Sequence, residues 1–172
     1  MAWLLLLAIA ALAAAVVAAA RRGLGALQDS RAAAWAALEA QLVKRHEHMI
    51  RVVGLCARLM TGERDTLERV TTSGSAVVAA VRRGNMPALA AAEKTHREAA
   101  AALFRLAENY PQFVTSRAFS ALRERTATLH ARVDERREAY NAAVSVLNFR
   151  CGAFPYSLVA RTMGVRPAPF LS

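Results

Sequence analysis

The hydrophobic pattern divides the chain into one uninterrupted apolar run and a longer part in which apolar residues recur at helical spacing. Residues 2–20 contain no charged residue and no proline, and Arg21 and Arg22 follow them directly. A helix needs roughly 20 mostly apolar residues to cross a hydrocarbon core of about 30 Å, and this run has 19. The run therefore predicts a transmembrane helix that anchors the rest of the chain.

A cleaved signal peptide is the alternative interpretation, because the three alanines ending at Ala20 resemble a small-residue cleavage site. Signal peptides usually begin with basic residues and have an apolar core of about 7–15 residues. Here no Lys or Arg precedes the run, and the run is longer. We therefore favour a retained anchor over cleavage after Ala20, and a buried core helix is the least favoured interpretation.

The charges that flank the run predict its orientation. Arg21, Arg22 and Arg31 follow it, whereas the terminal amine is the one positive group before it. Because cytoplasmic segments are enriched in Lys and Arg, we expect the N-terminus outside and the body in the cytoplasm.

Beyond the anchor, apolar residues recur every three or four positions, which is the spacing of one helix face. Gly23 and Gly25 are expected to loosen the chain, and Asp29 and Ser30 to cap a first helix that ends near Met60. Its stripe is Trp35, Leu38, Leu42, Met49, Val52, Cys56 and Leu59. A second helix has the weaker stripe Leu67, Val70, Gly74, Val77 and Val81.

Turn residues bound two further helices. Residues 84–87, Gly-Asn-Met-Pro, form the clearest turn and open a third helix, which ends before Pro111. A fourth and longest helix begins near Thr115 or Ser116 and breaks over residues 152–155. The inward positions of these two helices are Leu89, Ala92, His96, Ala99, Leu103 and Leu106, and then Phe119, Leu122, Thr126, Leu129, Val133, Tyr140, Val144, Leu147 and Cys151. A short helix over 156–163, closed by Gly164, is expected to follow.

Four amphipathic helices with short connections predict an antiparallel bundle with its stripes turned inward. The fold class expected is all-α, with an N-terminal transmembrane helix followed by an elongated antiparallel four-helix bundle and coiled-coil-like packing. The expected parts are an anchor over residues 1–22, a juxtamembrane linker over 23–29, the bundle over 30–164 and an extended tail over 165–172.

Composition supports helices and places limits on partners. Aromatic residues make up only 6% of the chain, and the net charge of +10 comes from 23 basic and 13 acidic side chains. The basic residues are spread along every helical stretch, often beside Glu, and no RNA-binding or zinc-finger signature accompanies them. We therefore expect a solvated helical surface and no nucleic-acid partner, with weak attraction to anionic lipid as the alternative.

The ionisable side chains suggest structure more than chemistry. His46 and His48 are two residues apart and so point about 200° apart on a helix, which keeps them from sharing one metal ion. We expect both on the surface, His130 exposed, and His96 as a hydrogen-bonded core residue. Cys56 and Cys151 fall on apolar stripes and are expected to be free thiols in a reducing cytoplasm.

Arg45 lies in register between Leu42 and Met49, so its guanidinium is expected to point inward and to need a carboxylate partner. The candidate partners are Glu63, Glu68, Glu108 and Glu135. An internal ion pair that fixes helix register is the favoured interpretation, and a ligand site is the alternative.

Tyr140, Asn141 and Asn148 place polar groups on or beside the inner face of the fourth helix. We interpret them as buried groups that set register, with a polar pocket that includes Arg45 as the alternative. The chain has no Gly-rich phosphate loop, Gly-x-Ser-x-Gly elbow or Cys-x-x-Cys pair, so we assign no catalytic, cofactor-binding or metal-binding residue.

A series of short elements runs along the chain in this order: Ala34-Trp35, Gln41-Leu42, Lys44-Arg45-His46-Glu47, Glu63, Thr66-Leu67-Glu68-Arg69-Val70, Leu106-Ala107-Glu108-Asn109-Tyr110-Pro111, Arg136-Arg137, Tyr140-Asn141, Asn148, Phe154-Pro155, Ala160, Gly164 and Pro169-Phe170. With these elements the chain resembles the LemA family of bacterial membrane-anchored helical proteins. The departures are Ile50-Arg51 where the family usually has Pro-Asn, Gly62 for a His, and Leu147 for a Tyr. Without that Pro the first helix should be straighter.

The resemblance implies a small external N-terminus, one span of a bacterial inner membrane and a cytoplasmic helical bundle, with no established enzyme activity. We therefore expect a non-enzymatic, single-pass protein whose bundle serves as an adaptor or scaffold for a protein partner or for itself. A membrane-tethered bundle that binds a small ligand or metal in its polar interior is the alternative.

Overall fold

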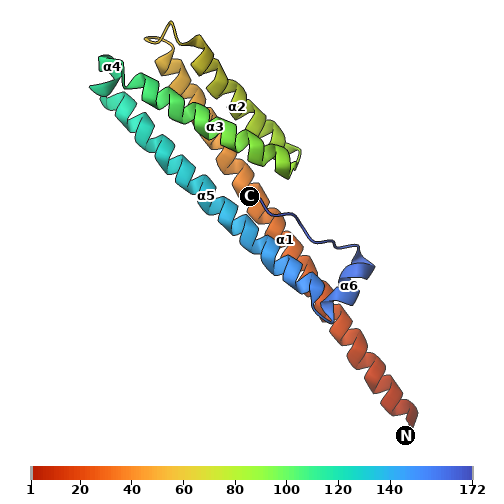
Figure 1. The fold of residues 1–172 in the computed structure, drawn as a ribbon. Coiled ribbons are helices and arrows are strands. Elements are labelled where there is room, and N and C mark those ends of the chain that lie inside the picture. Colours follow the sequence, from red (N-terminus) through yellow and green to blue (C-terminus); the bar gives the residue numbers. More distant parts are fainter. Residues whose placement is uncertain (1, 172) are drawn as a thin grey trace. The chain divides into compact units, whose positions relative to one another are not determined.

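The fold of the computed structural model is built from helices alone over the described residues, 2–171, so the predicted all-α class is confirmed (Figure 1). Met1 and Ser172, the outer ends of the predicted anchor and tail, lie outside the described residues. The helices are α1 (Ala2–Cys56), α2 (Arg64–Arg82), α3 (Met86–Ala107), α4 (Pro111–Val114), α5 (Arg117–Gly152) and α6 (Tyr156–Met163).

Local turn chemistry places most helix ends where the sequence predicts them. Gly84 has a φ of 62°, and the side-chain oxygen of Asn85 accepts a hydrogen bond from the Ala88 amide at 3.0 Å to cap α3. Ser116 caps α5 in the same way, through the Phe119 amide at 3.2 Å. Gly164, with a φ of 67°, ends α6. The one-turn helix α4 was not predicted.

The expected break between the anchor and the first bundle helix is wrong, because α1 is one helix of 55 residues that includes residues 23–29. A glycine inside a helix costs about 1 kcal/mol, which burial of a neighbouring leucine offsets. Leu24 is fully buried, and a Cβ on Gly23 would lie 3.2 Å from the Tyr156 ring. Gly23 is therefore a packing residue in a continuous helix rather than a hinge.

The chain forms two compact units. The first unit contains residues up to 35 together with 139–170, and so holds the N-terminal part of α1, the C-terminal part of α5, α6 and most of the tail. The second unit contains residues 36–138 with 171, and so holds the rest of α1, α2, α3, α4 and the N-terminal part of α5.

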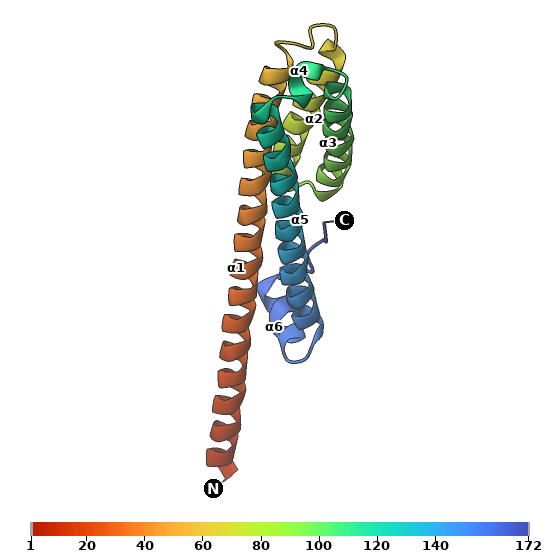
Figure 2. The ribbon, with the colours of Figure 1, turned by 90° about the vertical axis from the view of Figure 1, so that its left-hand side faces the viewer.

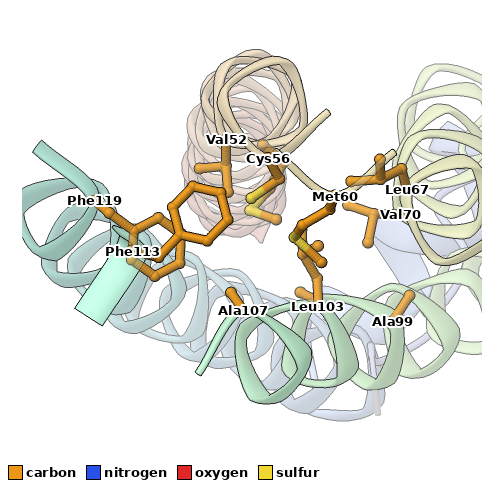
Figure 3. Packing of buried hydrophobic residues seen from close by; sticks show 12 residues of the cluster. Val52, Cys56, Met60, Leu67, Val70, Ala99, Leu103, Ala107, Phe113 and Phe119 are labelled. Atoms are coloured by element: carbon orange, nitrogen blue, oxygen red, sulfur yellow. The ribbon is translucent and has the colours of Figure 1, made fainter. Parts of the chain in front are cut away.

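In the second unit, α1, α2, α3 and α5 follow one another in alternating directions as an antiparallel bundle (Figure 2). Its apolar core includes Val52 and Cys56 from α1, and Figure 3 shows the Phe113 and Phe119 rings beside them. The ring centroids of Phe113 and Phe119 are 4.7 Å apart. Each fully buried large side chain contributes about 1.5–3 kcal/mol, so this core supplies much of the unit's stability.

In the first unit, the tail lies against α5 through two polar side chains. The amide of Asn148 donates to the Ala168 carbonyl at 3.0 Å and accepts from the Ala168 amide at 2.8 Å. The Tyr140 hydroxyl donates to the Pro169 carbonyl at 3.2 Å, and its ring packs on Trp35 with the centroids 5.2 Å apart. The backbone groups of the irregular tail are thus held by hydrogen bonds to side chains of α5.

Candidate functional site

The N-terminal part of α1 exposes nearly all of its apolar side chains. Residues 3–19 are exposed, and burial begins at Ala20, one residue before Arg21. Among residues 2–171, α1 is the one helix long and apolar enough to cross a membrane, and its apolar window is almost unburied. A core helix would be covered by protein, so the described part of the chain excludes that interpretation of residues 3–19.

A buried ion pair joins α1 to α3. The Arg45 side chain is 1% exposed and that of Glu93 is 13% exposed. Both terminal guanidinium nitrogens of Arg45 donate to Glu93, one to each carboxylate oxygen, with Nη1 to Oε2 at 3.0 Å. The prediction of a buried Arg45 with a carboxylate partner is therefore confirmed.

The partner itself was predicted wrongly, because Glu93 replaces all four candidates named from the sequence. Glu93 lies three residues before His96, on the face that α3 turns inward. Because His96 belongs to the predicted apolar stripe, the three-residue spacing could have identified Glu93 as an inward-facing carboxylate.

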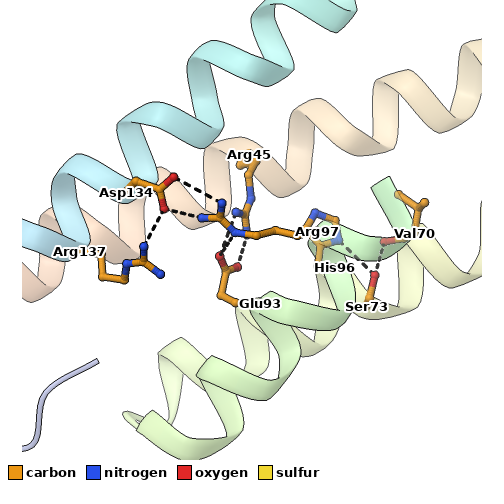
Figure 4. Close-up of polar contacts among 8 residues, drawn as sticks. All are labelled: Arg45, Val70, Ser73, Glu93, His96, Arg97, Asp134 and Arg137. Carbon is orange, nitrogen blue, oxygen red and sulfur yellow. Dashed lines mark hydrogen bonds and ion pairs between the residues drawn. The ribbon is translucent and has the colours of Figure 1, made fainter. Parts of the chain in front are cut away.

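The ion pair continues outward as a line of alternating charges that reaches α5 (Figure 4). Arg97 lies near Glu93, at 3.8 Å, and donates with two guanidinium nitrogens to Asp134. Arg137 approaches the same carboxylate at 3.2 Å. Burial alone would raise the pKa of Asp134, but the bonds and charges of Arg97 and Arg137 outweigh it and hold that pKa below its ordinary value.

His96 lies beside this line as a fully buried histidine, which confirms its predicted place in the core. Its Nδ1 is 3.1 Å from the Ser73 hydroxyl, which itself donates to the Val70 carbonyl. Because a hydroxyl has one proton, Nδ1 must be the donor to Ser73, and His96 is the neutral Nδ1-protonated form. Burial, together with the charge of Arg45, lowers the pKa of His96 to about 4.

The expected surface position of His48 is wrong. Its side chain is buried, and Nε2 lies 3.0 Å from the Leu122 carbonyl and 2.9 Å from the Thr126 hydroxyl. Burial lowers the pKa of His48 despite the Leu122 contact. His48 is three residues after Arg45, so it shares the inner face of α1.

His46 and His130 are also less exposed than predicted. Both are half-buried. Burial lowers the pKa of His46, and burial together with the charge of Arg45 lowers that of His130 to about 4. His46 lies so close to α2 that a Cβ on Gly74 would be 2.5 Å from its Nδ1. Glycine at position 74 therefore provides the space for the imidazole.

The arrangement of these residues does not form a metal centre. Glu93 and His96 have the three-residue spacing that carries metal ligands in some bundles, so the interpretation that the sequence contains no Glu-x-x-His pair is wrong. In the structure Glu93 is bound to arginine and His96 to Ser73. Within residues 2–171, no group of three or more His, Cys, Asp or Glu side chains is placed to hold a metal ion.

The sequence model of one family, the LemA family, matches residues 34–172. The chain belongs to the LemA family. The match begins beside Trp35 and includes both the charged line and the bonded tail, whereas the exposed apolar residues 3–19 precede it. A search of curated proteins finds no match.

Two of the three polar residues predicted on the fourth helix bind the tail of this LemA-family chain. Tyr140 and Asn148 bind tail carbonyls, and Asn141, half-buried, also has an interaction partner. All three belong to the first unit, whereas Arg45 belongs to the second.

Two open grooves run along the bundle of the second unit. The groove between α2 and α3 has a volume of about 530 Å³, and the one between α3 and α5 about 430 Å³. The first is lined by small and charged side chains: Asp65, Glu68, Arg69, Thr72, Ser73, Ala76, Ala92 and Thr95. The second contains His130 and Arg97. Both are surface grooves of a packed bundle rather than enclosed cavities.

The two cysteines are free thiols, as predicted. Cys56 is fully buried in the core of the second unit, and burial raises the pKa of its thiol to about 11. Cys151 is half-buried near the end of α5, and burial raises its pKa as well. A thiol with a raised pKa is a weak nucleophile, so both act as small apolar groups.

Proposed function

We propose that this LemA-family protein is a single-pass protein of the bacterial inner membrane whose cytoplasmic helical bundle acts as a non-enzymatic adaptor or scaffold. The observation that carries the proposal is the exposed apolar face of residues 3–19, which ends at Arg21 and Arg22. In water that surface would be strongly unfavourable, because about 25 cal/mol is lost for every Å² of apolar area left exposed. A bilayer removes that cost.

The interior of the bundle supports an adaptor role over catalysis. The charged groups between the helices of the second unit bind one another: the buried Arg45 binds Glu93, and the half-buried Arg97 and Arg137 bind Asp134. Such mutual pairing fixes how helices pack and leaves the outer faces for contacts with a partner or a second copy. The groove between α2 and α3 is one surface where such contacts would be made.

Membrane insertion is tested by carbonate extraction of cells that express the full chain. The wild-type protein should stay in the membrane pellet. A variant with Leu7→Arg and Leu12→Arg should appear in the soluble fraction, because a charge at the centre of a membrane helix costs about 2.5–3.5 kcal/mol. Release of the wild-type protein by carbonate would contradict the proposal.

Orientation and processing are tested on the same cells. A C-terminal epitope tag should survive protease treatment of intact spheroplasts and be lost after lysis, because the positive-inside rule places the body in the cytoplasm. N-terminal sequencing should find the unprocessed start. A mature protein that begins at Arg21, together with a tag digested in intact spheroplasts, would mean export and cleavage instead.

A second function, ligand binding by the bundle, is favoured by one observation. Nε2 of His130 is buried and has no hydrogen-bond partner among the described residues, and His130 lines the groove between α3 and α5 beside Arg97. Native mass spectrometry of detergent-purified full chain tests this function. A bound mass that His130→Leu removes would support ligand binding, whereas an unmodified chain mass would speak against it.

A further inference from the structure

The first unit places α6 against the part of α1 that leaves the apolar run. The Tyr156 ring lies where it would be 3.2 Å from a Cβ on Gly23, and Gly23 directly follows Arg22. Both views show α6 beside this part of α1 (Figures 1 and 2). The Arg150 guanidinium lies over the same Tyr156 ring, 5.0 Å from its centroid. α6 and the end of α5 are thus fixed to the first turn after the anchor.

That position corresponds to the headgroup layer of a bilayer if residues 3–20 span the hydrocarbon. The headgroup region adds about 5–8 Å on each side of the hydrocarbon core. A helix rises 1.5 Å per residue, so roughly the first five residues after Ala20 lie at headgroup depth. Tyr156 packs on Gly23, the third of them. Aromatic residues such as Tyr are enriched at this depth in membrane proteins.

The chain around Tyr156 exposes large apolar side chains. Phe149 is 74% exposed, Phe154 81% and Leu158 56%. They lie within ten consecutive residues that form the end of α5, the turn after it and the start of α6. Val159 and Ala160 of the same helix are buried. α6 is therefore a short amphipathic helix whose other face has no cover within the first unit.

The charge of the first unit matches an anionic lipid surface. It carries six arginines and one acidic residue, Asp29, whereas the second unit carries 17 basic and 12 acidic residues. Residues 139–170 contain three of those arginines and no carboxylate. Basic residues beside a membrane helix gain about 1 kcal/mol each from an anionic leaflet. Apolar groups combined with arginine are typical of helices that lie in the membrane interface.

We infer that the stretch from Phe149 to Leu158 is a second membrane contact, which inserts Phe154 and Leu158 into the interface of the bilayer that holds the anchor. This inference rests on the membrane span in the proposed function. The contact would hold the first unit against the lipid surface at two points, the exit of α1 and the turn between α5 and α6.

Nitroxide labels on the full chain, reconstituted in vesicles of phosphatidylcholine and phosphatidylglycerol, test this inference. The parent is Cys151→Ala, which keeps Cys56 because that thiol is fully buried and its pKa is about 11, so it should take up no label. Labels are placed at Phe154→Cys and Leu158→Cys in the turn, and at Leu12→Cys in the anchor. Accessibility is measured to oxygen, which concentrates in lipid, and to a nickel complex, which stays in water.

Ala139→Cys is the matched control, because Ala139 is exposed on α5 in the same unit. Its neighbour Tyr140 contacts Trp35, which lies 12 residues beyond Gly23 on α1, or about 18 Å along the helix axis. A label at 139 should therefore be in water. We expect the ratio of oxygen to nickel accessibility to be several-fold higher at positions 154 and 158 than at position 139.

The outcomes separate the two proposals. Lipid values at position 12 with water values at 154 and 158 would overturn the second contact and leave the anchor intact. Water values at position 12 would overturn both. Labels at 154 and 158 that are shielded from both reagents would show a protein surface in place of lipid, which also overturns the inference. Phe154→Asp, at a site with no packing to lose, should lower the ratio at position 158 towards that of the control.

Discussion

Arg45 and Glu93 are held face to face by two parallel hydrogen bonds between α1 and α3, at a position where Arg45 has almost no contact with water. A two-bond arginine–carboxylate pair fixes both distance and direction. Sliding α3 by one turn along α1 would leave the guanidinium without a partner in the core. The pair therefore specifies the register of the bundle more than it adds to its stability.

Removing one member of the pair should destabilise the bundle strongly. Arg45→Ala leaves the Glu93 carboxylate in a mostly buried site, and breaking a buried pair in this way costs about 3–5 kcal/mol. The measurement is thermal unfolding of the full chain in mild detergent, followed by far-UV circular dichroism. The double variant Arg45→Met with Glu93→Leu is the control, because a well-packed apolar pair is often neutral. A single variant as stable as wild type would contradict a structural role for the pair.

Gly74→Ala should destabilise the second unit even though alanine is the better helix former. The added Cβ would lie 2.5 Å from His46 Nδ1 and 3.2 Å from His96 Cε1, and overpacking of this kind costs about 1–3 kcal/mol. The control is Gly54→Ala on α1, where a Cβ meets nothing within 4 Å and should gain up to about 1 kcal/mol. His46→Ala added to Gly74→Ala should restore stability. Equal effects at both glycines would refute the steric explanation.

Acid should unfold the second unit through His96 and His130, whose pKa values are lowered by burial. The pKa values of His96 and His130 fall to about 4 in the folded chain, from an ordinary value of 6.5, chiefly because burial disfavours the charged form. Above pH 6.5 both are neutral in both states, and their contribution to stability is complete. As the pH falls from 6.5 towards 4, the unfolded chain binds protons that the folded chain does not, so stability decreases.

The slope should reach about 1.4 kcal/mol per pH unit for each histidine in that window and level off below pH 4. Urea unfolding at a series of pH values measures it. His130→Leu replaces the titratable imidazole with an apolar side chain and should remove part of the slope. Lys44→Met, a change of an exposed charge on the same unit, should leave the slope unchanged. An unchanged slope in His130→Leu would show that other groups control the acid sensitivity.

Features encoded by neighbouring residues could be predicted, and features that depend on distant segments could not. The Gly84 and Asn85 turn, the Ser116 cap and the inward position of Arg45 each follow from a few adjacent residues. The identity of Glu93 as the partner depends on how α3 is placed against α1, which no local pattern specifies. His48 was assigned to the surface because only its spacing from His46 was considered. Its three-residue spacing from Arg45 places it on the inner face of α1.

The continuity of α1 was missed for a related reason. Two glycines and an Asp-Ser pair indicate a helix break when only local propensity is considered. The structure has Leu24 fully buried and Gly23 beneath the Tyr156 ring, more than 130 residues away in sequence. The free energy gained from this tertiary packing exceeds the cost of about 1 kcal/mol for each glycine in a helix. The resemblance to the LemA family, in contrast, was readable from short motifs and is confirmed by the family match.

Asn148 should control whether the C-terminal tail stays bound to α5. Its side chain makes two hydrogen bonds to the Ala168 backbone, at 3.0 and 2.8 Å. Asn148→Ala removes both and leaves backbone groups without partners, which costs about 1–3 kcal/mol for a buried group. Hydrogen–deuterium exchange of the full chain should then show faster exchange over residues 165–171.

Tyr140→Phe is the matched comparison, because it removes a single bond to the Pro169 carbonyl and keeps the ring that packs on Trp35. Proline has no amide hydrogen, so one carbonyl contact is all that position can offer to Tyr140. The exchange rates should therefore rank wild type slowest, Tyr140→Phe next and Asn148→Ala fastest, with exchange over α2 and α3 the same in all three. Faster exchange over α2 and α3 in Asn148→Ala would mean that Asn148 supports the whole fold and not the tail alone.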